Sequence, residues 1–165
     1  MLRYYCPRNN RSTAILEGCF LAGVLDITKI ASGLFAYIPY WEYNSLMVWE
    51  VEYTCQFGDW WDELSEGQQD AVAARVALLA ERGPHLPYPY CSDINGSRHG
   101  VMRELRAQAG GNPLRVLYAF DPRRAAILLI GGDKTGNDRF YEEYVPVADN
   151  LYDEHLEELR EEGLI

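Results

Sequence analysis

The sequence predicts one α+β domain built from a strand, two consecutive helices, three antiparallel strands and a final helix. Three observations predict it: a capping box that precedes helical periodicity at residues 65–79, strand-like segments after residue 100, and an amphipathic acidic segment at the end. With 165 residues, of which 48% are apolar, the chain is long enough to form a hydrophobic core of its own. The order of elements therefore favours two early helices and a final helix packed on a small, mainly antiparallel twisted sheet.

Residues 1–46 are aromatic, show no regular period and lack clear helix caps, so we assign them no structure. From residue 48 the chain alternates apolar and polar residues, which predicts a first strand over residues 48–54. A second translation start is conceivable at Met47. We therefore expect residues 1–46 to be an N-terminal extension and residues 47–165 to be the domain.

Two helices are predicted to follow this strand. Asp59 is a possible cap for a short helix that carries two tryptophans. Ser65 and Gln68 form a capping box, and apolar residues then recur at helical spacing until Gly83 and the following proline end the second helix. The two helices are expected to pack as a hairpin.

Residues 84–100 read as a loop, after which residues 101–106, 114–121 and 124–130 are candidate strands. Pro122 lies in a turn between the last two, so these should be antiparallel neighbours. Residues 125–130 are apolar on both faces, which predicts a central strand. Pro146 is expected to open the final helix, whose inner stripe includes His155 as a packed or carboxylate-bonded histidine.

The charge is unevenly distributed along the chain. A formal net charge of -10 argues against nucleic acid as a partner, because phosphates repel net negative charge. Residues 92–141, however, hold eight basic residues against five acidic ones, whereas the remainder totals -13. This segregation can be chance clustering on solvated faces, or it can mark a local cationic cleft.

The cysteines and histidines show no metal-ligand spacing, so no metal or other cofactor is expected, and their pattern fits a cytoplasmic protein. The longest uncharged stretch, residues 30–41, is too short to cross a bilayer, so no membrane partner is expected.

Arg115 stands out because it lies among apolar positions of a predicted strand. A buried arginine needs a partner, so it should either meet a carboxylate such as Glu104 or point into an open cleft. Arg106 shares a face with Glu104, and antiparallel pairing can bring it beside Arg115. Lys134 follows two glycines that could supply a turn and aim it at the end of the sheet. The plainer reading is a surface ion pair between Arg106 and Glu104.

Several segments together resemble the phage-derived Gp49-like, HigB-type branch of the RelE/ParE toxin superfamily. They are the Gly-Pro helix stop at 83–84 and residues 93–99, 102–106, 114–120, 126–134 and 140–148. The resemblance covers about residues 47–160 and implies a RelE-like fold. It also implies a toxin of a type II toxin–antitoxin pair that enters the ribosomal A site and cleaves mRNA by metal-free attack of a ribose 2′-OH.

The resemblance also implies roles for individual residues. Arg115 matches the family's strand arginine, and Arg106 and Lys134 match its other cationic positions, which would stabilise phosphate. Tyr141 falls where relatives carry an aromatic residue and would orient or stack a base. Some RelE relatives carry lysines where this chain has Met102 and Glu104, which leaves the general base open. His99 is the candidate base, and the further substrate-binding candidates are Arg98 and Arg103.

The implied partners are the ribosome with its mRNA and a cognate HigA-like helix-turn-helix antitoxin, through which alone operator DNA would be contacted. Two alternatives stay open at this point: a ParE-like inhibitor of DNA gyrase, and a non-catalytic domain that only binds a partner.

Overall fold

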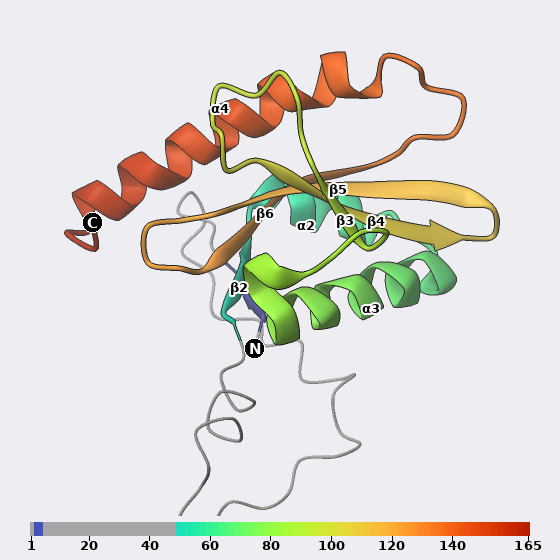
Figure 1. Ribbon diagram of the computed structural model, residues 1–165, viewed down its shortest axis with the longest axis horizontal. Coiled ribbons are helices and arrows are strands. Elements are labelled where there is room, and N and C mark those ends of the chain that lie inside the picture. The colour runs from blue at the N-terminus through green and yellow to red at the C-terminus, as the bar shows by residue number, and fades with distance from the viewer. Residues whose placement is uncertain (1, 5–48) are drawn as a thin grey trace, which may run out of the picture.

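The computed structural model describes residues 2–4 and 49–165 (Figure 1). The prediction that residues 1–46 form an extension therefore falls mostly outside the described residues. Within them, the elements are β1 (Leu2–Tyr4), β2 (Val51–Tyr53), α2 (Cys55–Asp62), α3 (Glu66–Arg82), the 3-10 turn η2 (Gly83–His85), β3 (Cys91–Asp93), β4 (Arg103–Ala109), β5 (Asn112–Phe120), β6 (Ala126–Asp133) and α4 (Phe140–Glu161). The predicted α+β class is confirmed.

The strands form one mixed sheet in the order β1-β2-β6-β5-β4-β3. β1, β2 and β6 run parallel, whereas β6, β5, β4 and β3 pair antiparallel. The prediction that residues 125–130 form a central strand is confirmed, because β6 has partners on both sides and its first four residues are fully buried. The predicted turn between β5 and β6 is also present at residues 121–125, where Asp121 and Ala125 are hydrogen-bonded.

The sheet is the middle of three layers, with α2 and α3 on one face and α4 on the other (Figure 1). The alternation predicted for β5 decides which residues face each layer. Val116 and Tyr118 pack with Phe57 and Leu79 on the α2–α3 side. Leu117 and its alternate neighbours pack against α4 on the opposite side.

The start of α2 differs from the sequence-based expectation. Asp59 lies inside the helix and is exposed, and the N-cap is Thr54, five residues earlier. The Thr54 hydroxyl accepts a hydrogen bond from the Phe57 amide at 3.2 Å and donates to the Leu129 carbonyl of β6. The capping box predicted at Ser65 and Gln68 is present, and Gly83 ends α3 with φ of 54°.

Two further expectations were wrong. Residues 84–100 are not only loop, because Cys91–Asp93 forms β3, a strand too short to show a period. Pro146 does not open the last helix but lies inside α4, which begins at Phe140. A proline removes one backbone donor. Burial of Phe140 and Val145 against the sheet holds these first turns in place.

Two glycines of β6 let aromatic side chains approach both faces of the sheet. A Cβ on Gly131 would lie 2.1 Å from the Trp60 ring, and one on Gly132 would lie 2.7 Å from the Tyr144 ring and 2.8 Å from that of Phe140. The expected role of these glycines in a turn is therefore wrong, because both are within β6 and lie in contact with α2 and α4. The first turns of α4 depend on this contact for their position on the sheet.

We expect Gly132→Ala to lower the free energy of unfolding by about 1–3 kcal/mol, because the new methyl group must displace packed rings. Gly67→Ala is the matched control, since a Cβ at Gly67 meets nothing within 4 Å and a helical alanine is favourable. Urea denaturation of both variants measures the difference. Equal stability of the two would contradict the packing described for α4.

A buried polar cluster joins β2, the β5–β6 turn and α4. Arg123 Nη2 lies 2.6 Å from both Glu52 Oε2 and Asp121 Oδ2, and His155 Nε2 lies 3.1 Å from the same Asp121 oxygen. The expectation of a carboxylate-bonded His155 is confirmed. Burial alone would raise the pKa of Asp121, but hydrogen bonds from His155, Arg123 and the Ala125 amide lower it below its ordinary 3.8.

We expect Asp121→Asn to lower the free energy of unfolding at neutral pH by about 3 kcal/mol, as for a broken buried ion pair. Because the folded-state pKa of Asp121 is depressed, its contribution is complete above the unfolded value near 3.8 and is lost as pH falls through the folded-state value. Urea denaturation at several pH values should show a smaller acid-induced loss in the variant. Exposed Asp138→Asn is the control, and matching behaviour of both variants would contradict the account.

Candidate functional site

The candidate site lies on the α4 side of the sheet, where β4 and β5 carry charged residues. α4 packs on β5 and β6. The register pairs Arg106 with Arg115 and Glu104 with Leu117, so alternation directs residues 104, 106 and 115 to the same face. The expected juxtaposition of the two arginines is confirmed.

Glu104 is the centre of this arrangement, with about 3% of its surface exposed. Its carboxylate accepts hydrogen bonds from Ser92 Oγ at 2.7 Å and from the Tyr141 hydroxyl at 2.9 Å. Arg115 Nε lies 3.6 Å and Arg106 Nε 3.8 Å from its oxygens. The expectation that Arg115 meets Glu104 is therefore confirmed.

The two arginines differ in accessibility. The Arg115 side chain is 9% exposed, and its Nη1 donates to the Leu114 carbonyl at 2.9 Å. The Arg106 side chain is 32% exposed, and its guanidinium lies 5.4 Å from the centre of the Tyr88 ring. Arg115 is thus held in a buried position, whereas Arg106 is accessible to a ligand in solvent.

Tyr141, in the first turn of α4, lies next to the Glu104 side chain, and Lys134, just after β6, lies next to Tyr141. Lys134 Nζ lies 5.5 Å from the centre of the Tyr141 ring, so the lysine lies beside the residue that bonds Glu104. Burial and then the hydrogen bond to Glu104 raise the pKa of Tyr141 above 10.0, against the opposing effect of Arg115. Tyr141 is therefore a neutral hydrogen-bond donor at physiological pH.

We call Ser92, Glu104, Arg106, Arg115, Lys134 and Tyr141 the Glu104 cluster. It contains three cationic side chains and one carboxylate, so its formal charge is positive although the chain as a whole is acidic. This excess of positive charge favours binding of an anionic group that can replace the Glu104 carboxylate as the partner of the two arginines.

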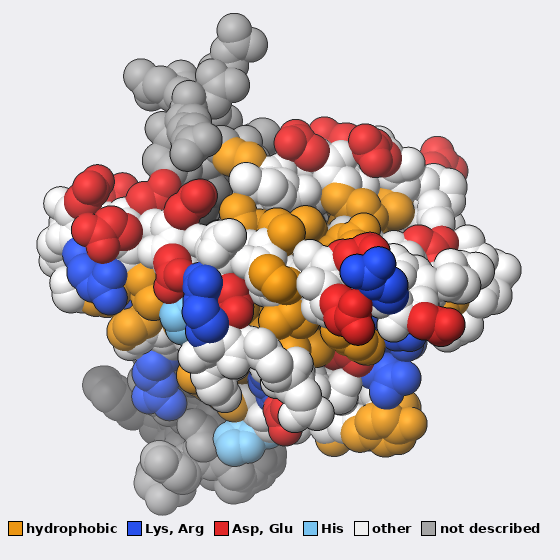
Figure 2. Space-filling view, turned by 90° about the horizontal axis from the view of Figure 1, so that it is seen from above, with side chains coloured by type: hydrophobic (Ala, Val, Ile, Leu, Met, Phe, Trp, Pro, Cys, Tyr) orange, Lys and Arg blue, Asp and Glu red, His pale blue; other side chains and the backbone are white. Residues whose placement is uncertain are grey.

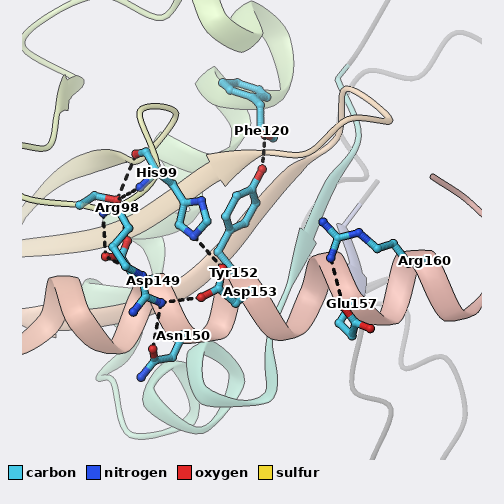
Figure 3. Close-up of polar contacts among 10 residues, drawn as sticks. Arg98, His99, Phe120, Asp149, Asn150, Tyr152, Asp153, Glu157 and Arg160 are labelled. Atoms are coloured by element: carbon cyan, nitrogen blue, oxygen red, sulfur yellow. Dashed lines mark hydrogen bonds and ion pairs between the residues drawn. The ribbon is translucent and has the colours of Figure 1, made fainter.

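Arg98 and His99 lie elsewhere, on a loop that is fastened to the middle of α4 (Figure 3). His99 Nε2 lies 2.8 Å from Asp153 Oδ1, and Arg98 donates to Asp153 and, at 3.1 Å, to Asn150. Asp153 follows Tyr141 by twelve residues, which is about 18 Å along the helix axis. His99 is thus separate from the Glu104 cluster.

Arg103 lies on the opposite face of β4 from Glu104. Its Nε donates to Asp93 Oδ1 at 3.0 Å and its Nη1 to the Pro84 carbonyl at 3.1 Å. It pairs in register with Tyr118, which belongs to the core on the α2–α3 side. Of the seven residues chosen from the sequence, four therefore come together and three do not.

Sequence reasoning missed Ser92 and Tyr88. Ser92 was assigned to a loop, and only its place in β3, opposite Glu104 in the register, brings it to the carboxylate. Tyr88 lies between two prolines in an irregular segment. An isolated tyrosine in a loop carries no periodic signal that could have singled it out.

One set of potential metal ligands occurs among residues 2–4 and 49–165: Glu52, Asp121 and His155. Its carboxylates are bridged by Arg123, which already supplies a positive charge there. Within the same residues, no helix is both long and apolar enough to cross a membrane.

The fold and the cluster define an α+β domain that presents cations around a buried carboxylate, an arrangement able to hold a phosphodiester. Residues 59–153 match the family described as phage-derived protein Gp49-like (DUF891), and the chain belongs to this family.

Two relatives come from Mycobacterium tuberculosis. The chain is 39% identical over 99 residues to a candidate toxin named HigB2, a match that covers 59% of this chain and 49% of the relative. It is 42% identical over 91 residues to a candidate toxin named HigB3, covering 54% of this chain and 78% of that relative. The chain thus spans about half the length of HigB2.

Proposed function

We propose that the protein is the toxin of a type II toxin–antitoxin module and cleaves mRNA in the ribosomal A site. The observation that carries the proposal is the convergence of Arg106, Arg115, Lys134 and Tyr141 around Glu104. The protein's membership of the Gp49-like family and its similarity to two HigB relatives support the proposal that it is a toxin.

The arginines would bind the phosphate whose bond is cleaved. In the free protein they lie near Glu104, and a phosphodiester offers two oxygens that compete for the same guanidinium groups. Attack at phosphorus adds negative charge to these oxygens, so fixed guanidinium groups stabilise the transition state more than the ground state. Arg115 is suited to this role because burial and the bond to Leu114 hold it in one orientation.

Glu104 would act as the general base in place of His99. It is the carboxylate beside both arginines, and binding of phosphate to the guanidinium groups would free it to accept the 2′-OH proton. The 2′-oxygen then bonds to phosphorus as the bond to the 5′-oxygen breaks, and Lys134 supplies the proton that the leaving oxygen needs. The products are a 2′,3′-cyclic phosphate and a 5′-hydroxyl, with Tyr141 orienting Glu104.

The overall charge suits an enzyme that meets its substrate on the ribosome. A net charge of -10 predicts weak non-specific affinity for free RNA. Acidic side chains are scattered over the face seen in Figure 2, with hydrophobic side chains and fewer Lys and Arg side chains between them. The ribosome would hold the message in place, so the toxin needs only a local cationic cluster.

We further propose a cognate helix-turn-helix antitoxin as the partner that neutralises the toxin, with operator DNA contacted only through it. The HigB relatives support this proposal. Co-expression with the product of the neighbouring gene should yield a stable complex and restore growth. A toxin that no neighbouring gene product binds or neutralises would contradict it.

Inducible expression in a bacterial host, followed by primer extension on a translated message, tests the proposed activity. In-frame cuts that disappear in Arg115→Ala, or when a stop codon prevents translation of the region, would support it. Stalled replication with intact mRNA would instead favour a ParE-like gyrase inhibitor. Normal growth together with intact mRNA would favour a domain that only binds a partner.

A further inference from the structure

Tyr88 is an exposed aromatic side chain beside the Glu104 cluster. It is 72% exposed, more than any other large hydrophobic side chain in the described part of the chain. The Arg106 guanidinium lies 5.4 Å from the centre of its ring, and the same arginine approaches Glu104. Tyr88 therefore contributes little to the hydrophobic core, yet its ring contacts Arg106 of the Glu104 cluster.

The backbone holds this ring in a defined position. The Tyr90 amide donates to the Pro87 carbonyl at 3.0 Å, and the Arg106 amide donates to the Tyr90 carbonyl at 2.8 Å. Arg75 lies 5.0 Å from the centre of the Tyr90 ring and donates to the Arg106 carbonyl. The segment that carries Tyr88 is thus held by contacts with β4 and α3, so ligand binding costs little conformational entropy in this segment.

We propose that Tyr88 is a base-stacking residue, which takes the nucleobase next to the phosphate bound by Arg106 and Arg115. The inference rests on the proposed function, since it places RNA at the same cluster. A planar ring that leaves one face open beside a guanidinium is a platform on which unpaired bases stack. Tyr141 is half-buried and bonded to Glu104, whereas the Tyr88 ring is largely exposed.

Contact with Arg106 favours a nucleic acid over a protein partner. Arg106 would hold the phosphate on one side and support the Tyr88 ring on the other, so that the sugar–phosphate backbone and its base meet adjacent groups. Stacking tolerates every base, so Tyr88 should increase affinity for the message without reading its sequence by hydrogen bonds.

The experiment uses the full chain with ribosomes programmed with an mRNA that it cleaves. The variants are Tyr88→Ala and Tyr88→Phe, with exposed Leu164→Ala as matched control. We expect Tyr88→Ala to lower kcat/KM about 10-fold, mainly through KM, and the other two to stay within about 2-fold of the wild type. Arg115→Ala is measured in parallel to test the proposed function itself.

A second readout reports stacking directly. The message carries 2-aminopurine beside the scissile phosphate and a 2′-deoxy sugar that prevents cleavage. Binding of the wild type and Tyr88→Phe should quench its fluorescence, whereas Tyr88→Ala should not.

Three outcomes overturn the inference. If Arg115→Ala abolishes cleavage while Tyr88→Ala keeps wild-type kcat/KM and quenching, the proposed function stands and Tyr88 is not a stacking residue. If Tyr88→Ala instead weakens only antitoxin binding, the ring serves a protein interface. If the wild type cleaves no message, the proposed function fails and this inference fails with it.

Discussion

Replacing Arg115 by alanine is expected to slow cleavage of ribosome-bound mRNA by about 100–1000-fold, which is typical for loss of one fixed donor to a developing oxyanion. Arg115 is 9% exposed and bonded to the Leu114 carbonyl, so its guanidinium is held in one orientation, whereas the neighbouring Arg106 is more exposed. A single-turnover assay with saturating protein measures the effect on the chemical step, separate from binding.

Two comparisons separate this catalytic effect from loss of the fold. Arg115→Lys keeps the positive charge near Glu104 but loses the planar fork, so it should remain folded and still cleave slowly. Arg139→Ala removes an exposed arginine whose partner is Glu142 and should behave like the wild type. Wild-type rates in a folded Arg115→Ala protein would exclude Arg115 from the site.

Replacing Glu104 by glutamine is expected to lower the cleavage rate by about 100–10,000-fold, the range attributed to a positioned general base. The amide has the size of the carboxylate. Its one oxygen can accept a hydrogen bond from Ser92 or from Tyr141, and its NH2 group can donate to the other hydroxyl, but the amide cannot take a proton. The same single-turnover assay measures the effect, with thermal unfolding as a check on the fold.

His99→Ala is the informative partner of this variant, because His99 was the base expected from the sequence. Its partner Asp153 lies twelve residues along α4 from Tyr141, which bonds Glu104, so we expect loss of His99 to leave the cleavage rate within a few-fold of wild type. A nearly active Glu104→Gln protein together with an inactive, folded His99→Ala protein would reverse the assignment.

Periodic and strongly capped parts of the fold could be predicted from the sequence. The capping box at Ser65 and the apolar residues of β6 are each visible as a local sequence pattern, and both elements occur as predicted. The start of α4 could not be predicted, because local propensity favours Pro146 as a first residue whereas tertiary contacts of Phe140 extend the helix backwards. Thr54 was missed as a cap, although threonine is a preferred N-cap residue, because the helix was expected to begin at Asp59.

The positions of the candidate site residues could be predicted only where strand pairing determines which residues are neighbours. Alternation and antiparallel pairing predicted that Arg106 shares a face with Glu104 and lies beside Arg115, whereas contact between Arg115 and Glu104 was one of two alternatives. The local balance of +3 was a poorer guide, because several of its cations are paired with acids elsewhere in the fold. Arg98 pairs with Asp153 of α4, and Arg123 with Glu52 of β2.

Mapping of 5′ ends on ribosomes that hold a defined codon in the A site tests the central claim most directly. The account predicts that the purified wild type cuts the message within that codon and leaves a 5′-hydroxyl on the downstream fragment. Folded Arg115→Ala and Glu104→Gln proteins should leave the message intact. Absence of cleavage by the wild type, or equal cleavage by all three proteins, would contradict the claim that the Glu104 cluster is the active site of a ribosome-dependent endoribonuclease.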